Sequence, residues 1–297
     1  MPRTLSSYVI AITPFAADGS VDETSVRRHL RRMADAGLGI YVGGGGSGEG
    51  FTLSDAEMAR LLHVAVDELG GRVRAMGVEP RTAVQMVSFV EQAAAAGVEA
   101  CQIYSIDPGH GHRPTMQEVE RYFDDVLGNC SLPAVISTHQ SVGYRIPPDL
   151  LTRLIGRHPQ VIGLNCSHAD LTYLAQLVDA VGTRVEICVG GPLQALSALG
   201  VGAHGFLSSE ANLAPDLVAS IGAAVERGDL DAALDAYGLL ARLHELLYGN
   251  GGIRMTKAVL ARLGLPGGGH PRLPQLAPAD DAVEHVLRRL GDWGLRP

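Results

Sequence analysis

The stretch with the clearest potential for ligand chemistry is a run of glycines at the end of an apolar segment. Residues 39–54 read GIYVGGGGSGEGFTLS, in which Gly46, Ser47 and Gly48 lie just before an expected helix. Glycine lets the backbone approach a ligand closely, and successive unpaired N–H groups form an anion-binding concavity. The spacing does not match a P-loop, because no Gly-Lys-Ser/Thr follows. The stretch therefore indicates either an anion-binding loop or a plain tight turn.

Polar side chains that could move protons follow several other apolar runs. Asn165 and Ser167 share parity along one run, so both should point to the same side of it. His139 and His168 stand at the ends of two runs, and histidine can carry a proton near neutral pH. The other candidates at the ends of runs, or in the loops after them, are Glu79, His110, His112 and Glu210.

These residues support three interpretations. In the first, a histidine acts as general acid or base while Asn165 and Ser47 polarise or position a substrate oxygen. In the second, His110, His112, His139 or His168 helps to bind a divalent metal, because imidazole and carboxylate groups are suitable ligands. In the third, the histidines are solvated loop residues and Asn165 is a hydrogen-bonded amide of the interior.

Short apolar runs alternate with amphipathic stretches along the chain. The runs cover Tyr8–Ile12, Leu38–Gly43, Val73–Val78, Ala100–Tyr104, Ala134–Thr138, Val161–Cys166, Val185–Val189 and Gly205–Ser208. This alternation predicts parallel strands with crossover helices, and eight repeats predict an α/β fold of the (β/α)8 TIM barrel type. A doubly wound sheet is the alternative. In such a barrel the active site lies at the carboxyl ends of the strands, which is where the glycine-rich stretch falls.

After the eighth run the pattern becomes helical only. We therefore expect residues 1–228 to form the barrel and residues 229–297 to form a C-terminal helical extension, with a Gly/Pro-rich linker inside it. Three helix starts fit the capping-box pattern, in which a Ser or Thr is followed three residues later by Glu. These pairs are Ser20 with Glu23, Ser54 with Glu57, and Thr115 with Glu118.

Composition narrows the class of protein. The formal net charge of −8 and the lack of basic runs argue against a nucleic-acid partner. The N-terminus lacks the apolar core of a signal peptide and no run approaches the length of a membrane span, so we expect a cytoplasmic protein without a membrane partner. The four scattered cysteines are expected to be free thiols. Lys257 is the only lysine, so a mechanism that needs a lysine amine must use it.

Four short motifs, taken in order, resemble the dihydrodipicolinate synthase / N-acetylneuraminate lyase family. They are Ala11-Ile12-Thr13-Pro14-Phe15, Gly45-Gly46-Ser47-Gly48-Glu49, Val161-Ile162-Gly163-Leu164 and Gly205-Phe206-Leu207-Ser208. The resemblance implies a TIM barrel with a helical extension, often a homotetramer. It also implies a 2-oxo acid, commonly pyruvate, bound as an imine to a lysine on the sixth strand. A tyrosine on the fifth strand would relay protons, and the turn after the second strand would hold the substrate carboxylate.

Residue by residue, this resemblance carries over only in part. The carboxylate-binding turn is present in altered form, with Gly46 and Ser47 in the places of two hydroxyl residues. The position of the imine lysine is Asn165, whose amide nitrogen is not a nucleophile. The position of the tyrosine falls at Ile136 or Ser137, and the arginine that usually follows is also missing. Lys257 aligns with a C-terminal helix and is expected to be structural or exposed.

The sequence thus predicts a lyase-like enzyme that acts on a small 2-oxo-acid-like carboxylate without a lysine imine. The alternatives are a catalytically silent member that binds a small acid or a partner protein, and a metal-dependent hydratase or aldolase. We expect no cofactor and no resident metal, and a homo-oligomer, either tetramer or dimer. The candidate catalytic residues are Asn165, His139, His168 and Ser137, and the candidate substrate-binding residues are Gly46, Ser47, Gly48, Ser167 and Glu210.

Overall fold

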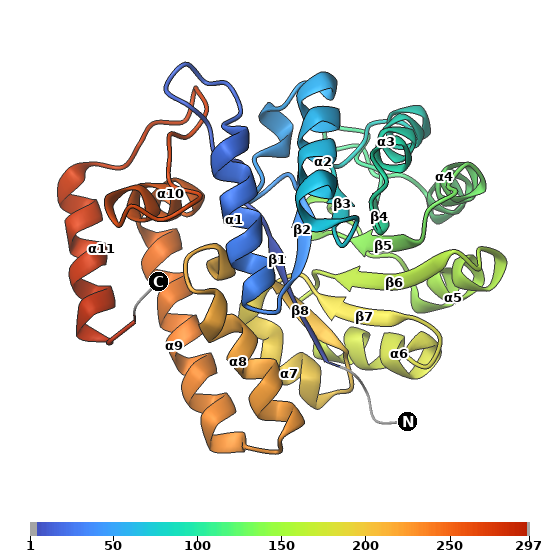
Figure 1. The fold of residues 1–297 in the computed structure, drawn as a ribbon. Helices are drawn as coiled ribbons and strands as arrows, with labels where there is room; N and C mark the ends of the chain where they lie inside the picture. The colour runs from blue at the N-terminus through green and yellow to red at the C-terminus, as the bar shows by residue number, and fades with distance from the viewer. Residues whose placement is uncertain (1–4, 296–297) are drawn as a thin grey trace.

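The computed structural model describes residues 5–295 and contains a closed barrel of eight parallel strands (Figure 1). Each strand pairs with the next in the chain, and β8 pairs with β1 to close the barrel. The predicted (β/α)8 TIM barrel is therefore confirmed, and the doubly wound alternative is wrong. The strands are β1 (Ser6–Ile10), β2 (Gly39–Val42), β3 (Arg74–Met76), β4 (Ala100–Tyr104), β5 (Ala134–Thr138), β6 (Val161–Cys166), β7 (Glu186–Val189) and β8 (Gly205–Ser208).

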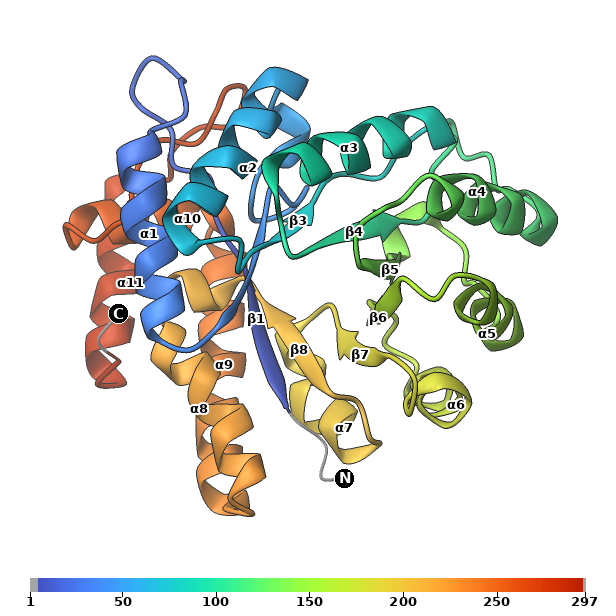
Figure 2. The same cartoon turned by 45° about the vertical axis from the view of Figure 1, so that its right-hand side comes forward.

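Helices surround the barrel (Figure 2), and their buried apolar residues share one core with the strands. This arrangement buries both faces of the parallel strands, as the continuous apolar runs require. The helices are α1 (Glu23–Asp35), α2 (Asp55–Leu69), α3 (Ala83–Ala96), α4 (Met116–Gly128), α5 (Pro148–Arg157), α6 (Leu171–Val181), α7 (Ala195–Gly200) and α8 (Pro215–Glu226).

Two of the three predicted capping boxes are present. The hydroxyl groups of Ser54 and Thr115 accept from the backbone N–H three residues on, and the corresponding Glu side chains accept from the cap backbone in return. The prediction for Ser20 is wrong. Helix α1 begins at Glu23, so the residue directly before it, Asp22, forms the cap and accepts from the backbone N–H of Ser25 at 3.0 Å.

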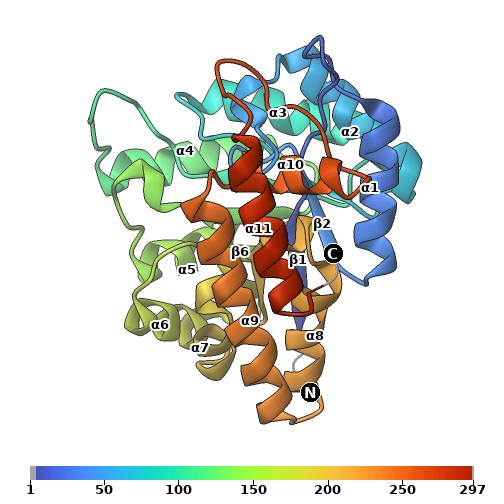
Figure 3. The same cartoon turned by 90° about the vertical axis from the view of Figure 1, so that its left-hand side faces the viewer.

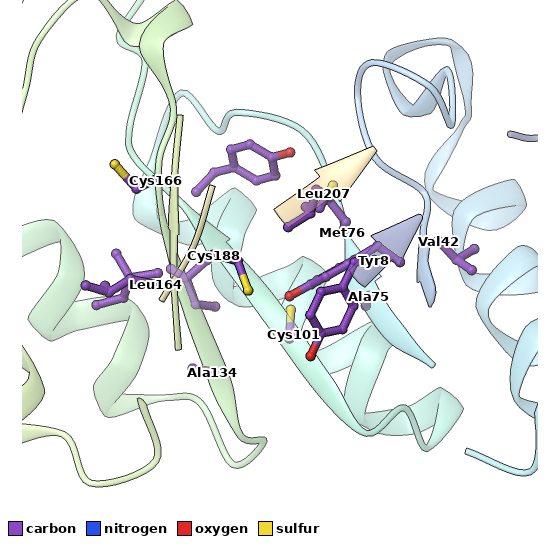
Figure 4. Packing of buried hydrophobic residues seen from close by; sticks show 14 of the residues in the cluster. Tyr8, Val42, Ala75, Met76, Cys101, Ala134, Leu164, Cys166, Cys188 and Leu207 are labelled. Atoms are coloured by element: carbon purple, nitrogen blue, oxygen red, sulfur yellow. The ribbon is translucent and has the colours of Figure 1, made fainter. Parts of the chain in front are cut away.

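A cluster of polar and aromatic side chains fills the lower end of the barrel, where the strands have their amino ends. Tyr8 Oη donates to Glu186 at 2.9 Å, and the Arg74 guanidinium lies 2.9 Å from the same carboxylate. Arg74 also stacks 4.6 Å from the centroid of the Tyr8 ring. Figure 4 shows Tyr8 with Met76, Cys188 and Leu207 among the buried side chains of this core. Burial and the Glu186 charge raise the pKa of Tyr8, so the phenol remains a hydrogen-bond donor.

The four cysteines are buried and free, as expected. Within residues 5–295, no helix combines the length and the apolar character needed to cross a membrane.

Three further helices follow the barrel: α9 packs against α8, and α10 packs against both α9 and α11 (Figure 3). They are α9 (Leu230–Gly249), α10 (Ile253–Arg262) and α11 (Asp280–Asp292). Apolar residues of these helices, such as Leu247, Met255 and Val286, form a second core with Ile12 and Leu213 of the barrel side. The division of the chain between residues 228 and 229 stays a prediction.

Candidate active site

The glycine-rich turn lies over the barrel interior at the end formed by the carboxyl ends of the strands. A Cβ atom on Gly44 would come within 2.7 Å of both Ile10 Cγ2 and Met76 Sδ, which belong to β1 and β3. Thr13 Oγ1 donates to the carbonyl oxygen of Gly48 at 2.7 Å and ties the turn to the end of β1. Among the hydrogen bonds of residues 5–295, none is donated by the backbone N–H of Gly46, Ser47 or Gly48. Three consecutive donors are thus left for a ligand.

A pair of amide side chains lies inside the barrel below this end. Asn165 on β6 donates from Nδ2 to Oε1 of Gln102 on β4 at 3.0 Å. The strand between them is β5, so the bond can only pass through the barrel interior. The remaining Nε2 of Gln102 and Oδ1 of Asn165 are buried and have no partner among the described residues. Because buried polar atoms without partners are rare in proteins, such a pair indicates a place for a ligand.

Further buried polar atoms without a partner belong to the same strands or to residues that directly follow them. Tyr104, Ser137 and Asn165 are register partners on β4, β5 and β6 and therefore face the same side. Buried atoms without a partner also include Ser137 Oγ, Thr138 Oγ1 and His168 Nε2. Five of the six such atoms in the described residues therefore belong to β4, β5 and β6 or to the residues that follow them.

A carboxylate–histidine–serine cluster stands at the ends of β3 and β5. His139 Nδ1 lies 2.8 Å from Glu79 Oε1 and 2.5 Å from Ser141 Oγ, and Ser141 Oγ also donates to Glu79 at 2.7 Å. Burial alone would raise the pKa of Glu79, but the hydrogen bonds from His139 and Ser141 outweigh it and lower the pKa to about 2. The carboxylate therefore remains charged at neutral pH and orients the imidazole.

This cluster lies next to the turn and contacts Tyr104, which shares a face of β4 with Gln102. A Cβ atom on Gly45 would be 3.8 Å from Glu79 Oε2. On the other side, the His139 ring contacts the Tyr104 ring edge-on, with 5.9 Å between the centroids. Burial and the Glu79 charge raise the pKa of Tyr104, so its phenol is protonated at neutral pH.

Ser167 occupies the same face of β6 as Asn165, as its parity predicts. A Cβ atom on Gly190, which follows β7, would collide with Ser167 Oγ and lie 3.2 Å from Asn165 Oδ1. Gly190 therefore keeps room around both side chains, and the place of Ser167 in substrate binding stays a prediction.

Two candidate residues lie apart from the amide pair. The His168 ring packs edge-on against Tyr173 of α6 at a centroid distance of 5.4 Å, and burial followed by the Arg145 charge lowers its pKa. Glu210 is buried, accepts from Ser208 Oγ at 2.7 Å and pairs with His244 Nδ1 of α9 at 2.7 Å. The carboxylate of Glu210 is thus engaged by β8 and α9, and its predicted contact with substrate stays untested.

His110 and His112 lie exposed in the loop after β4. In the described part of the chain, no three His, Cys, Asp or Glu side chains come together in a group that could hold a metal ion. The ligand set that the metal-dependent alternative requires is therefore not assembled there.

Sequence reasoning overlooked Gln102, Tyr104 and Ser141. Gln102 is a polar residue in the middle of the apolar run ACQIY, with the same parity as Tyr104. This isolated polar residue was the available signal for a polar barrel interior. Ser141 carried no such signal, because its contact with Glu79 joins two loops that are far apart in the chain.

A cavity of about 470 Å³ opens beside the site, between the end of β3 and helices α2 and α3. Its lining includes Gly77, Glu79 and Phe89 but neither member of the amide pair. Gln102 is fully buried and Asn165 is only 4% exposed. This cavity therefore does not reach the amide pair.

Comparison with known proteins decides the family. The model of the dihydrodipicolinate synthetase family matches residues 4–291. The chain belongs to the dihydrodipicolinate synthetase family. Membership places the chain among a family of lyases.

Members of the family from distant organisms match nearly the whole chain. It is 30% identical over 281 residues to the 4-hydroxy-tetrahydrodipicolinate synthase of Hyphomonas neptunium, covering 93% of each chain. It is 26% identical over 292 residues to the enzyme of that name from Methanopyrus kandleri, covering 96% of this chain and 95% of the relative.

Solved structures of the family share the fold. The dihydrodipicolinate synthase of Aquifex aeolicus superposes with a TM-score of 0.88 at 22% identity, covering 98% of this chain and 99% of the other. A prophage protein of the family from E. coli K12, crystallised with pyruvate, gives a TM-score of 0.89 at 19% identity, covering 98% of this chain and 99% of the other.

Proposed function

We propose that the protein is a lyase that acts on a small 2-oxo-acid-like carboxylate without forming a lysine imine. Family membership supports lyase chemistry, and one relative of the same fold was crystallised with pyruvate. The free N–H groups of Gly46, Ser47 and Gly48 offer a site for the substrate carboxylate. The expected homo-oligomeric assembly and cytoplasmic location stay predictions.

The position of the only lysine supports a mechanism without an imine. Asn165 takes the place on β6 where the family resemblance expects a lysine, and an amide cannot form a Schiff base. Lys257 lies on α10, fully buried, with its ammonium group paired to Glu49. No other lysine exists in the chain. In this proposal, hydrogen bonds stabilise the electron pair released in the reaction.

The amide pair is suited to that task. Each primary amide has one carbonyl acceptor and one N–H donor group, and a single bond between two amides uses one of each. Whichever way Gln102 and Asn165 are turned, one N–H donor and one carbonyl acceptor remain. In the observed bond these are Gln102 Nε2 and Asn165 Oδ1. A preorganised N–H donor of this kind stabilises an oxyanion as it develops.

A complete cleavage can be written with these groups. For a 4-hydroxy-2-oxo acid, His139 removes the hydroxyl proton, the bond between carbons 3 and 4 breaks, and an aldehyde leaves. The electron pair moves onto the 2-oxo group as an enolate, whose oxygen accepts from the free amide N–H. The enolate then takes this proton back from the His139 imidazolium at carbon 3 and leaves as the 2-oxo acid, which restores the neutral imidazole. Glu79 stabilises the imidazolium formed at His139.

The observation that carries this proposal is the presence of three unpartnered buried polar atoms, Gln102 Nε2, Ser137 Oγ and Asn165 Oδ1, on the inward side of β4, β5 and β6. A purely structural interior would pair these atoms with one another. The unpaired donor and acceptor are instead arranged as a ligand would need them.

Borohydride reduction in the presence of pyruvate, followed by intact-mass measurement, tests the absence of an imine. We expect no adduct on the wild-type protein and an adduct on Asn165→Lys, because a buried lysine has a lowered pKa and a nucleophilic neutral amine. An adduct on the wild type would overturn the proposal.

Release of 2-oxo acid from a panel of 4-hydroxy-2-oxo acids tests the reaction itself. Asn165→Ala and His139→Ala should each lower kcat/KM by about 10²-fold or more. The matched control is Asn129→Ala, which removes an exposed amide on the far end of α4 and should leave kcat/KM unchanged. A wild-type protein that binds pyruvate but releases no 2-oxo acid from any member of the panel would favour the silent, acid-binding alternative.

A further inference from the structure

Lys257 is joined to the glycine-rich turn across almost the whole length of the sequence. Its side chain is fully buried, and Nζ forms an ion pair with Oε2 of Glu49, the residue that ends the anion-binding part of the turn. Nζ also lies 4.4 Å from the centroid of the Phe15 ring and 3.5 Å from the carbonyl oxygen of His270. Of the two expected roles of Lys257, structural or exposed, the structural one agrees with this burial, because these partners enclose the ammonium group.

The segment between α10 and α11 approaches the same region. It runs beside the loop after β1 (Figure 1), where the Arg272 guanidinium donates to the carbonyl oxygen of Gly19 at 3.0 Å. Arg272 also donates from its backbone N–H to Glu49 Oε1 at 3.5 Å and pairs with Glu57 of α2. The C-terminal segment thus contacts both oxygens of the Glu49 carboxylate.

Glu49 holds a backbone conformation that needs such support. Its φ is 51°, in the left-handed region that residues with a side chain rarely adopt. Its N–H donates to the carbonyl oxygen of Gly46 at 3.1 Å, which closes the turn around the free donors of Ser47 and Gly48. Residues in this region persist only where their surroundings fix them. The contacts of Lys257 and Arg272 with the side chain provide this fixation.

We propose that Lys257 is a positioning residue: through Glu49 it holds the glycine-rich turn in its anion-binding shape, so that affinity for the substrate carboxylate depends on the C-terminal helices. The identity of the substrate in this inference rests on the proposed function, whereas the effect of Lys257 on the turn is independent of it. Lys257 takes no part in the chemical step.

Hydrogen exchange of the full-length protein tests the effect on the turn. In Lys257→Met the backbone amides of residues 43–53 should exchange about tenfold faster than in the wild type, because the tether to Glu49 is lost. The matched control is Arg262→Met, which removes a cation from the same helix whose partners Asp280 and Glu284 are exposed. This control should exchange like the wild type throughout the turn.

Lys257→Met leaves the Glu49 charge buried and unpaired, whereas the double variant Glu49→Gln/Lys257→Met removes both charges. The double variant therefore separates the loss of positioning from the effect of an unpaired buried charge. It also replaces the single variant if that variant does not fold. Positioning predicts that the turn still exchanges faster in the double variant. Wild-type exchange in either variant would overturn the proposal.

Pyruvate binding, measured by calorimetry, gives the second readout. Lys257→Met should raise the Kd for pyruvate by about tenfold, while any turnover measured at saturating substrate stays near the wild-type kcat. An unchanged Kd beside a lowered kcat would contradict a positioning role. A wild-type protein that does not bind pyruvate would count against the proposed function, and the exchange rates would still decide the role of Lys257.

Discussion

The Glu79 carboxylate is partly enclosed at the mouth of the barrel and accepts hydrogen bonds from two side chains. Its pKa falls from 4.5 to about 2, because the bonds from His139 and Ser141 outweigh the effect of burial. A carboxylate with a lowered native pKa stabilises the fold fully above its unfolded pKa. This contribution is lost as the pH falls from about 4.5 towards 2.

Replacement of Glu79 should therefore change the acid stability of the protein. With the side chain 24% exposed, we expect Glu79→Gln to lower the free energy of unfolding at pH 7 by about 1–2 kcal/mol. The difference from wild type should shrink between pH 4.5 and 2. Denaturant unfolding across this pH range measures it, with Glu91→Gln on the exposed side of α3 as the control. Parallel curves for wild type and Glu79→Gln would show that the carboxylate has no lowered pKa.

At single residues, the sequence predicts position better than partner. The parity of Asn165 and Ser167 correctly places the two side chains on one side of β6, because side-chain alternation in a strand is local. The bond from Asn165 to Gln102 crosses 63 positions, and the pair of Lys257 and Glu49 crosses 208. Such partners are set by barrel closure and by the path of the C-terminal segment, which no local pattern encodes.

The sequence predicts the bounds of a strand well where turn residues mark both of its ends. Strands β4, β5, β6 and β8 have the predicted bounds, because each apolar run is flanked by turn residues. β1 instead covers Ser6–Ile10, two residues earlier than the predicted run. Its start is fixed by pairing between Ser6 and Gly205 of β8, so polar residues enter the strand while Ala11 and Ile12 lie beyond it.

The start of α1 gives a prediction at this scale. Asp22→Ala should lower the free energy of unfolding by about 1 kcal/mol, because it removes the acceptor of the Ser25 N–H. Ser20→Ala should cost less than half of this, since within residues 5–295 the Ser20 hydroxyl bonds only to Asp18, in the loop before the helix. Chemical denaturation of both variants measures the difference. A larger loss for Ser20→Ala than for Asp22→Ala would show that Ser20 is the cap, as the sequence pattern predicts.

The whole molecule depends on the closure of the sheet between its last and first strands. Gly205 opens β8 at this seam, where it is the register partner of Ser6 on β1 and of Cys188 on β7. A Cβ atom at this position would collide with the backbone oxygen of Ser6 and lie 3.3 Å from Cys188 Sγ. The backbone of β1 cannot move away without loosening the barrel, so the lack of a side chain at Gly205 is a condition of closure.

Gly205→Ala should therefore lower the free energy of unfolding by about 1–3 kcal/mol through overpacking at the seam. The control is Gly156→Ala on the exposed side of α5, where a Cβ would meet nothing within 4 Å. There alanine should stabilise the fold by about 0.5–1 kcal/mol, because it favours the helix and restricts the unfolded chain. Denaturant unfolding of the two variants would thus show shifts of opposite sign. If Gly205→Ala were as stable as the wild type, β1 and β8 would be able to separate at their lower ends without cost, and barrel closure would not depend on close approach at this glycine.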